Sequence, residues 1–130
     1  MTTSDGRLVT QYNLGVPTPR DLATSLGRVP RFVGHSKVWW TVLHHVAHVY
    51  RTLERYIEEL GNDSFERSFQ LKALLHDSEE SILGDLPTPW KAEGRREQEE
   101  RLCARIERCY GLASGDEYES LLRRADAAGS

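Results

Sequence analysis

Long apolar runs, long basic runs and strand-like alternation are all missing from this sequence of 130 residues. The longest apolar stretches fall far short of the ~20 residues that a membrane-spanning helix needs, which argues against a membrane protein. Residues 1–6 lack the apolar region of a signal peptide, so we expect a cytoplasmic protein. The 17 Lys and Arg stand against 20 Asp and Glu, which argues against binding to a nucleic-acid polymer.

Cysteine is scarce as well, with Cys103 and Cys109 the only two. They stand six residues apart on one expected helix, about 240° from each other around its axis, which disfavours a mutual disulfide. Reduced thiols suit a reducing compartment. Neither cysteine has a CxxC or Cys-His spacing beside it, so we expect no metal-binding or catalytic role for either.

The segments that are present predict an all-α fold around one hydrophobic core. Residues 1–17 mix small, polar, Gly and Pro positions and predict an irregular arm, and residues 18–130 would form the domain. Four residues are candidate N-caps, and these are Thr18, Ser36, Ser64 and Ser114. The expected helices, about five to six in all, cover residues 19–26, 37–60, 65–76, 78–83, 91–110 and 115–127.

The long helix expected after Ser36 has one apolar face, and this face selects one of three histidines. The face is made of Trp39, Val42, Val46, Val49, Leu53 and Leu60. At about 100° per residue, only His45 lies at the border of this face and can reach the interior. His44 would point towards solvent, and His48 would be at best a flanking residue.

The stretch LLHDSEESILGDLPTP, residues 74–89, has the pattern of an active-site floor. An apolar run leads into His76 and Asp77, three further acidic residues follow within eight positions, and a segment rich in Gly and Pro ends the element. Buried imidazole and carboxylate groups lose their hydration, and a bound cation compensates for that loss. The stretch therefore predicts a metal site.

Four candidate metal ligands come from three expected helices, and these are His45, His76, Asp77 and Asp126. Imidazole and carboxylate ligands with open coordination positions suit Mn, Co, Fe or Zn, which activate water and polarise a phosphoryl oxygen. Each residue also has an ordinary explanation. His45 could be a histidine at the edge of the core, and His76 with Asp77 could be a helix-terminal pair facing the helix dipole. Their combination favours the metal site.

This combination resembles the HD superfamily of metal-dependent phosphohydrolases, whose motif is H…HD…D contributed by separate helices. Residues 40–45 (WTVLHH) match the family segment (Y/W)-S/T-V-x-x-H, and residues 76–91 (HDSEESILGDLPTPWK) match HDxxExxxGDxPxPxK. The resemblance spans roughly residues 31–126 and is closest to bacterial 5′-deoxynucleotidases and phage dATP triphosphohydrolases. It implies a compact HD-domain helical bundle.

The resemblance also implies a divalent metal ion, with Mn, Co, Zn, Fe or Mg as candidates, held by His45, His76, Asp77 and Asp126. Glu80 would orient or deprotonate the attacking water; as an alternative, it is a solvated helix carboxylate. Asp85 would assist in acid-base chemistry or hold its own loop. These expectations make Glu80 and Asp85 the candidate catalytic residues.

Six residues are candidates for contact with substrate, and these are Arg31, Phe32, His35, Thr88, Lys91 and Arg123. Arg31 and Phe32 match a family Arg-aromatic pair, usually Arg-Trp, that reaches phosphate and packs on the sugar or base. Phe keeps a stacking surface but lacks the indole N–H. Lys91 matches a lysine that meets substrate phosphate. Arg123 could bind phosphate or face solvent, and the loop residue His35 could touch phosphate or have no such role.

A deoxynucleotide substrate follows from the resemblance, and two reactions compete for it. A 5′-deoxynucleotidase would convert a dNMP to deoxynucleoside and phosphate, whereas a dNTP triphosphohydrolase would release triphosphate or successive phosphates. The segment around residues 76–91 favours the nucleotidase, which we expect; the short interval from Asp77 to Asp126 favours the triphosphohydrolase. A non-catalytic nucleotide-binding module is the alternative of another class. Hydrolysis of a signalling nucleotide is less favoured, because the sequence lacks the extra ligands of a two-metal site.

The sequence ends four residues after Asp126, whereas family members usually continue for several tens of residues. We therefore expect either a short form of the family or a chain that lacks C-terminal helices. A neighbouring subunit could anchor this end of the domain, and we expect a homo-oligomer. Trp39 and Trp90 could serve its interface or could belong to the core.

Overall fold

The structure, a computed structural model, describes residues 1–4, 6, 15–59, 67–86, 91–112 and 119–128. These residues form six α-helices and one 3₁₀-helix, and they contain no strand beyond isolated bridges such as that between Pro30 and Thr41. The predicted all-α fold is confirmed. None of the described helices is both long and apolar enough to cross a membrane.

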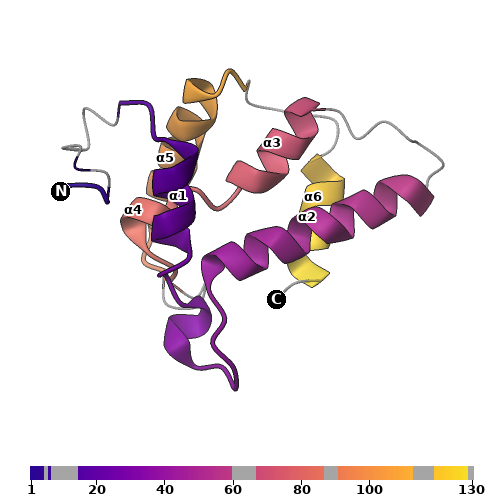
Figure 1. The fold of residues 1–130 in the computed structure, drawn as a ribbon, viewed down its shortest axis with the longest axis horizontal. Helices are drawn as coiled ribbons and strands as arrows, with labels where there is room; N and C mark the ends of the chain where they lie inside the picture. Colours follow the sequence, from indigo (N-terminus) through magenta and orange to yellow (C-terminus); the bar gives the residue numbers. More distant parts are fainter. Residues whose placement is uncertain (5, 7–14, 60–66, 87–90, 113–118, 129–130) are drawn as a thin grey trace.

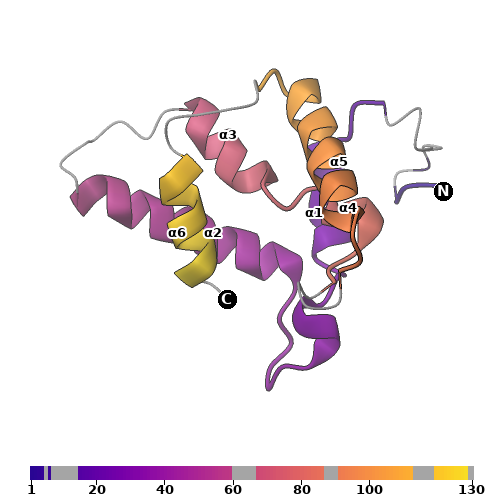
Figure 2. The same ribbon diagram turned by 180° about the vertical axis from the view of Figure 1, so that it is seen from behind.

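The helices fall into two groups that meet near the N-terminal end of α2. Their bounds are α1 (Pro19–Leu26), η1 (Arg31–Gly34), α2 (Val42–Glu59), α3 (Arg67–Leu75), α4 (Glu80–Leu83), α5 (Arg95–Cys109) and α6 (Glu119–Ala128). α3 and α6 pack against α2, the longest helix (Figure 1). α1, α4 and α5 gather at the other side, as both views show (Figure 1, Figure 2). The turn between α3 and α4 joins the two groups.

Two apolar clusters fix this turn from both sides. The first cluster joins α2, α3 and α6 and consists of Val49, Leu53, Ile57, Phe69, Ala73, Leu122 and Ala125. The second cluster joins α1, α3 and α5 and consists of Leu22, Leu75 and Ile106. α3 contributes to both clusters, so burial of its two faces holds its C-terminal end in place. His76 and Asp77 follow directly after that end.

The predicted start of the long helix after Ser36 is wrong, because α2 begins at Val42. Thr41 takes the capping role: its Oγ1 accepts a hydrogen bond from the His44 backbone N–H at 3.3 Å, and its own N–H donates to His44 Nδ1 at 3.0 Å. Backbone pairing of Thr41 with Pro30 keeps the preceding segment extended. Trp39 therefore lies outside the helix and is 66% exposed, which corrects its predicted place in the core.

Other predicted boundaries agree closely with the structure. Thr18 caps α1, since its side chain accepts a hydrogen bond from the Asp21 backbone N–H, and the helix ends at Leu26. Gly84 ends α4 with a φ of 77°, a conformation that favours glycine. α5 begins at Arg95, four residues later than residue 91. The predicted caps Ser64 and Ser114, together with Leu60, Phe65, Trp90 and residues 7–14 of the predicted arm, lie outside the described residues.

Candidate metal centre

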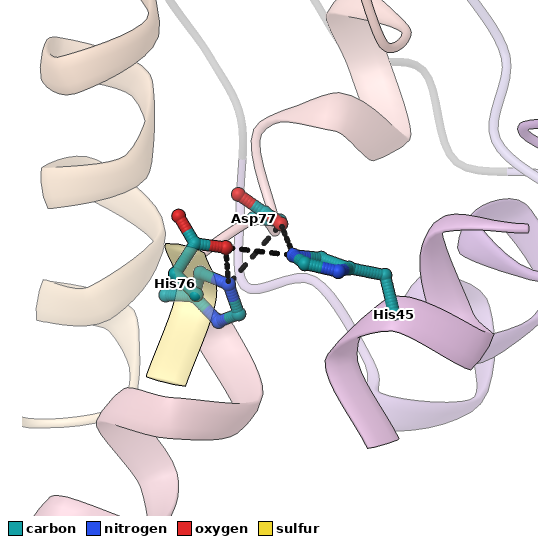
Figure 3. A group of neighbouring side chains, drawn as sticks. His45, His76 and Asp77 are labelled. Atoms are coloured by element: carbon teal, nitrogen blue, oxygen red, sulfur yellow. Dashed lines mark hydrogen bonds and ion pairs between the residues drawn. The ribbon is translucent and has the colours of Figure 1, made fainter. Parts of the chain in front are cut away.

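The four candidate ligands converge from three separate parts of the chain. His45 comes from α2, His76 and Asp77 come from the turn after α3, and Asp126 comes from α6. Each offers a ligand atom that lies within 4.8 Å of the ligand atoms of the others. Figure 3 shows the His45 and His76 rings turned towards the carboxylate of Asp77. The structure thus brings together residues that are 81 positions apart in sequence.

The distances within this group fit a site for one ion. His45 Nε2 lies 2.7 Å from Asp126 Oδ1 and 3.5 Å from Asp77 Oδ2. His76 Nε2 lies 3.4 Å from the same Asp126 oxygen and 3.2 Å from the same Asp77 oxygen. Donor atoms bound at about 2.0–2.2 Å around one tetrahedral ion lie roughly 3.3–3.6 Å from one another. Modest adjustment of the Asp126 side chain would complete this geometry.

The backbone sets which nitrogen of His76 faces the site. Nδ1 of His76 lies 2.7 Å from the carbonyl oxygen of Ala73, one turn earlier. A carbonyl only accepts hydrogen bonds, so Nδ1 carries a proton and Nε2 is the nitrogen that faces the centre, where it could bind a cation once its own proton has left. His45 is fully buried, and its Nδ1 has no hydrogen-bond partner in the described part of the chain. Its Nε2, like that of His76, faces the carboxylates.

The electrostatics of the group favour a positive charge at its centre. Burial alone would lower the pKa of His76, but Asp77 and Asp126 together raise that pKa well above its usual value. Hydrogen bonds with His45 and then His76 hold the pKa of Asp126 well below its usual range. In the metal-free chain, protonated imidazole supplies the positive charge. A divalent cation would take over this role from the imidazolium protons.

Two glutamates lie directly beside the centre and are almost fully buried. Glu79 is 7% exposed and Glu80 is 6% exposed, so Glu80 is not a solvated helix carboxylate. Burial, followed by the charge of Asp77, raises the pKa of Glu79 to about 8 and that of Glu80 to about 10. Sequence reasoning did not single out Glu79. Its position next to Glu80 in a charged segment carries no signal of burial.

Asp85 connects the centre to the η1 segment. Its Oδ2 lies 3.5 Å from Arg31 Nη1, and its charge is among the causes that raise the pKa of Glu80. Arg31 also lies over the Phe32 ring, 4.9 Å from the ring centroid. Phe32 is 40% exposed and has a φ of 56°, which is unusual for a residue with a Cβ and often marks a functional site. These contacts favour the loop-holding role for Asp85.

The other candidates for substrate contact are less closely tied to the centre. His35 is exposed at the end of η1. Lys91 pairs with Glu99 at 2.8 Å, and Arg123 pairs with Glu119 at 3.1 Å on the surface of α6. Thr88 lies outside the described residues.

A cavity of about 600 Å³ opens beside the metal centre. Its lining includes His76 and Glu79, together with Lys91 and Arg123. Lys72 also lines it and pairs with Glu107 at 3.6 Å. Lys72 was not predicted from the sequence, because a polar residue next to the apolar stripe of a helix carries no signal of a cavity. The cavity therefore combines one edge of the metal centre with several basic side chains.

Cys103 lies behind the centre rather than in it. Its thiol contacts the carbonyl oxygens of Leu75 and His76 at 3.5 Å and 3.6 Å. Burial, followed by the charges of Glu79 and Glu107, raises the pKa of this thiol far above its usual value. A thiol that stays protonated is a poor ligand and a poor nucleophile. Both cysteines are free, as the sequence predicted.

Comparisons with known proteins give a distant relative without a described activity. No protein-family model matches the chain. The uncharacterized protein YfdR of Escherichia coli (strain K12) is 30% identical over 94 residues, which are 71% of this chain and 46% of that protein. The chain thus spans about half the length of the curated relative that it matches.

Proposed function

We propose that this protein is an HD-type, metal-dependent phosphohydrolase acting on deoxynucleotides, and specifically a 5′-deoxynucleotidase. The observation that carries the proposal is the convergence of two imidazole nitrogens and two carboxylate oxygens from α2, α6 and the turn after α3. A divalent ion of the Mn, Co, Zn, Fe or Mg group would supply Lewis-acid activation of a phosphoryl oxygen and of a bound water.

The surrounding residues can supply the remaining chemistry. Glu80, beside Asp77, would orient the attacking water. It would accept the proton of that water once a bound cation has lowered its raised pKa. Arg31 would neutralise charge that develops on the phosphoryl oxygens, and its contact with Asp85 holds it in place. The exposed ring of Phe32 offers a stacking surface for a base or sugar. Asp85 acts in this scheme by positioning Arg31 and Glu80.

Hydrolysis of a dNTP is the second candidate reaction, and the cavity beside His76 supports it. The basic residues Lys72, Lys91 and Arg123 line this cavity, where they could meet a longer phosphate chain. Against this, each of the three pairs with a glutamate of the same chain. A triphosphate would have to displace those carboxylates. We therefore place the monophosphate first.

We further propose a cytoplasmic, homo-oligomeric protein. The two free cysteines suit a reducing compartment. Val38 and Trp39 are 67% and 66% exposed and adjacent in sequence, and they offer an apolar surface to a second subunit.

The decisive experiment measures nucleoside and phosphate release from a panel of dNMPs, NMPs and dNTPs, with Mn, Co, Zn or Mg added in turn. We expect metal-dependent release of phosphate and deoxynucleoside from at least one dNMP. Consumption of dNTPs with release of triphosphate would instead assign the second reaction. His76→Ala serves as the inactive control, and circular dichroism checks that this variant folds.

Absence of release across the whole panel, from folded protein with bound metal, would contradict both reactions. A nucleotide that then still binds the metal-loaded chain would identify a non-catalytic binding module. That outcome would assign a binding role to the same four ligands.

A further inference from the structure

We infer that the turn between α3 and α4 holds a second divalent cation, bound by Asp77, Glu79 and Glu80 next to the centre described above. Each of these three carboxylates offers an oxygen that lies within 4.8 Å of the oxygens of the other two. The inference goes beyond the proposed function and gives Glu80 a ligand role in place of the direct contact with water proposed above. It does not depend on the hydrolase, because cation binding is measured without substrate.

Burial separates this group from ordinary acidic clusters. Surface carboxylates are commonly close together without an ion, because water solvates them. Glu79 and Glu80 are 7% and 6% exposed, and the Oε2 atom of each is buried without a hydrogen-bond partner in the described structure. A buried polar atom without a partner is costly, and native structures rarely leave one. A cation between the carboxylates would give both oxygens a partner.

Asp77 belongs to both groups and can serve both ions. Its Oδ2 atom faces the imidazoles, at 3.2 Å from His76 Nε2 and 3.5 Å from His45 Nε2. A carboxylate has two oxygens, so the other one can bind a neighbouring ion. Paired metal ions in phosphoryl-transfer sites lie about 3.5–4 Å apart, the spacing that one bridging carboxylate allows. The shared aspartate therefore favours two adjacent ions over two unrelated ones. Glu79 and Glu80 would then supply the extra ligands of a two-metal site, which the sequence was expected to lack.

The local backbone explains why three residues so close in sequence can converge. In a regular α-helix, residues i and i+2 point about 200° apart, so Asp77 and Glu79 would face opposite sides. Residues 76–79 instead form tight turns, with the Glu80 N–H donating to the Asp77 carbonyl at 3.0 Å. The Ile82 N–H likewise donates to the Glu79 carbonyl at 3.1 Å. This departure from helical geometry brings the three carboxylates together.

The two sites differ in ligand chemistry and should differ in the ions they prefer. The first site mixes imidazole with carboxylate, which suits Zn, Co or Mn. The second offers only carboxylate oxygens, which suit harder ions such as Mg or Mn. Mn can occupy both sites, and Mg should compete with Mn at the second site only.

The test counts Mn ions bound to the full chain by electron paramagnetic resonance at increasing free Mn. We expect two ions for the wild type and one for Glu79→Gln, whose affinity for the second ion should fall more than tenfold. Glu79→Gln keeps the shape of the side chain and places no charge in the interior, so it should fold. Glu97→Gln, on the exposed face of α5, is the matched control and should still bind two ions.

Two further measurements separate this inference from the proposed hydrolase. Millimolar Mg should displace one of the two Mn ions from the wild type. His45→Ala should lose the first ion and keep the second. Binding of only one ion by the wild type, or of two ions by Glu79→Gln, would overturn the second site. Two bound ions without any nucleotide hydrolysis would uphold the second site and contradict the hydrolase.

Discussion

Two groups of side chains were expected to act on the same substrate, but their surroundings in the structure differ. The candidate metal ligands His45, His76 and Asp126 point at one centre and contact one another. The basic residues Lys91 and Arg123 instead pair with nearby glutamates, Glu99 and Glu119. The candidate ligands already converge on one point, whereas the basic residues would have to exchange partners to meet a phosphate.

This difference has a physical cause. A metal site built from buried imidazole and carboxylate groups must be assembled by the fold, because no solvent can satisfy its members. A phosphate site at the surface has no such requirement, and a local ion pair contributes only about 0–1 kcal/mol. Arg31 stands between these extremes: its side chain is 13% exposed and is tied to the centre through Asp85. We therefore expect substitutions to reduce activity most at the candidate metal ligands, less at Arg31 and Asp85, and least at the surface cations.

Removal of a ligand should have the largest effect. We expect His76→Ala to lower the rate of phosphate release by more than about 1000-fold and to weaken Mn binding more than tenfold, because the centre loses a donor. Asp126→Asn should have a smaller effect on Mn binding, since its side chain is 47% exposed and can be replaced by water. The matched control is His48→Ala on the exposed face of α2, which should behave as wild type.

Substitution of Asp85 should have an intermediate effect on kcat/KM. The kinetic parameter that changes distinguishes a residue that positions Arg31 from one that transfers a proton. If Asp85 positions Arg31, Asp85→Asn should lower kcat/KM by about tenfold, mainly through a higher KM. Proton transfer by Asp85 would instead reduce kcat by about 10²–10⁴-fold at unchanged KM. Steady-state kinetics with a single dNMP distinguishes the two results. Arg31→Ala should reproduce the KM effect of Asp85→Asn, and the double variant should add little.

The stability of the metal-free chain should depend on pH in a direction set by the buried acids. The pKa of Glu79 is raised from 4.5 to about 8 and that of Glu80 from 4.5 to about 10, so the folded chain binds more protons than the unfolded chain. The free energy of unfolding should therefore fall as the pH rises from about 5 to 8. The raised pKa of His76 adds to this trend.

Urea unfolding with EDTA at pH 5 and pH 8 measures this effect. Glu79→Gln should flatten the pH dependence, because it removes one of the titrating acids. Added Mn should restore stability at pH 8, where the carboxylates can bind it. A metal-free wild type that gains stability between pH 5 and pH 8 would show that these acids are ionised in the folded chain. Below about pH 4 a separate loss should appear, because the pKa values of Asp77 and Asp126 are lowered.

The surface cations should have the smallest effects. Lys91→Ala should raise KM by about 3- to 10-fold, because the residue lines the cavity but must leave Glu99 to reach a phosphate. Arg123 is 78% exposed and pairs with Glu119 four residues earlier, so Arg123→Ala should change kcat/KM less than about twofold. A larger effect for Arg123 than for Lys91 would favour a phosphate chain that extends towards α6, as in dNTP hydrolysis.

Much of the candidate centre could be predicted from the sequence, for physical reasons. Helical rotation selects His45 over His44 and His48, and His45 is indeed the buried one of the three. The pattern of residues 76–91, and not the His-Asp dipeptide alone, led to the prediction of a site there. Convergence with Asp126 depends on how α6 packs on α2, which helical periodicity alone does not determine. The structure places these residues together.

Other features could not be predicted, because tertiary contacts decide them. Ser36 and Thr41 are both good caps in sequence, and backbone pairing of Thr41 with Pro30 determines that α2 begins after Thr41. Trp39 fits an apolar stripe only if the helix extends to it. The group of Asp77 with Glu79 was missed because helical spacing places those residues on opposite faces. Tight turns, which the sequence pattern does not reveal, bring them together.

Anomalous scattering of Mn in crystals of the full chain tests the metal centre most directly. We predict an anomalous peak at about 2.0–2.3 Å from Nε2 of His45 and His76 and from carboxylate oxygens of Asp77 and Asp126. A weaker peak beside Glu79 would mark the second ion. A chain that binds Mn in solution but shows no peak among these four residues would contradict the metal centre and the hydrolase built on it.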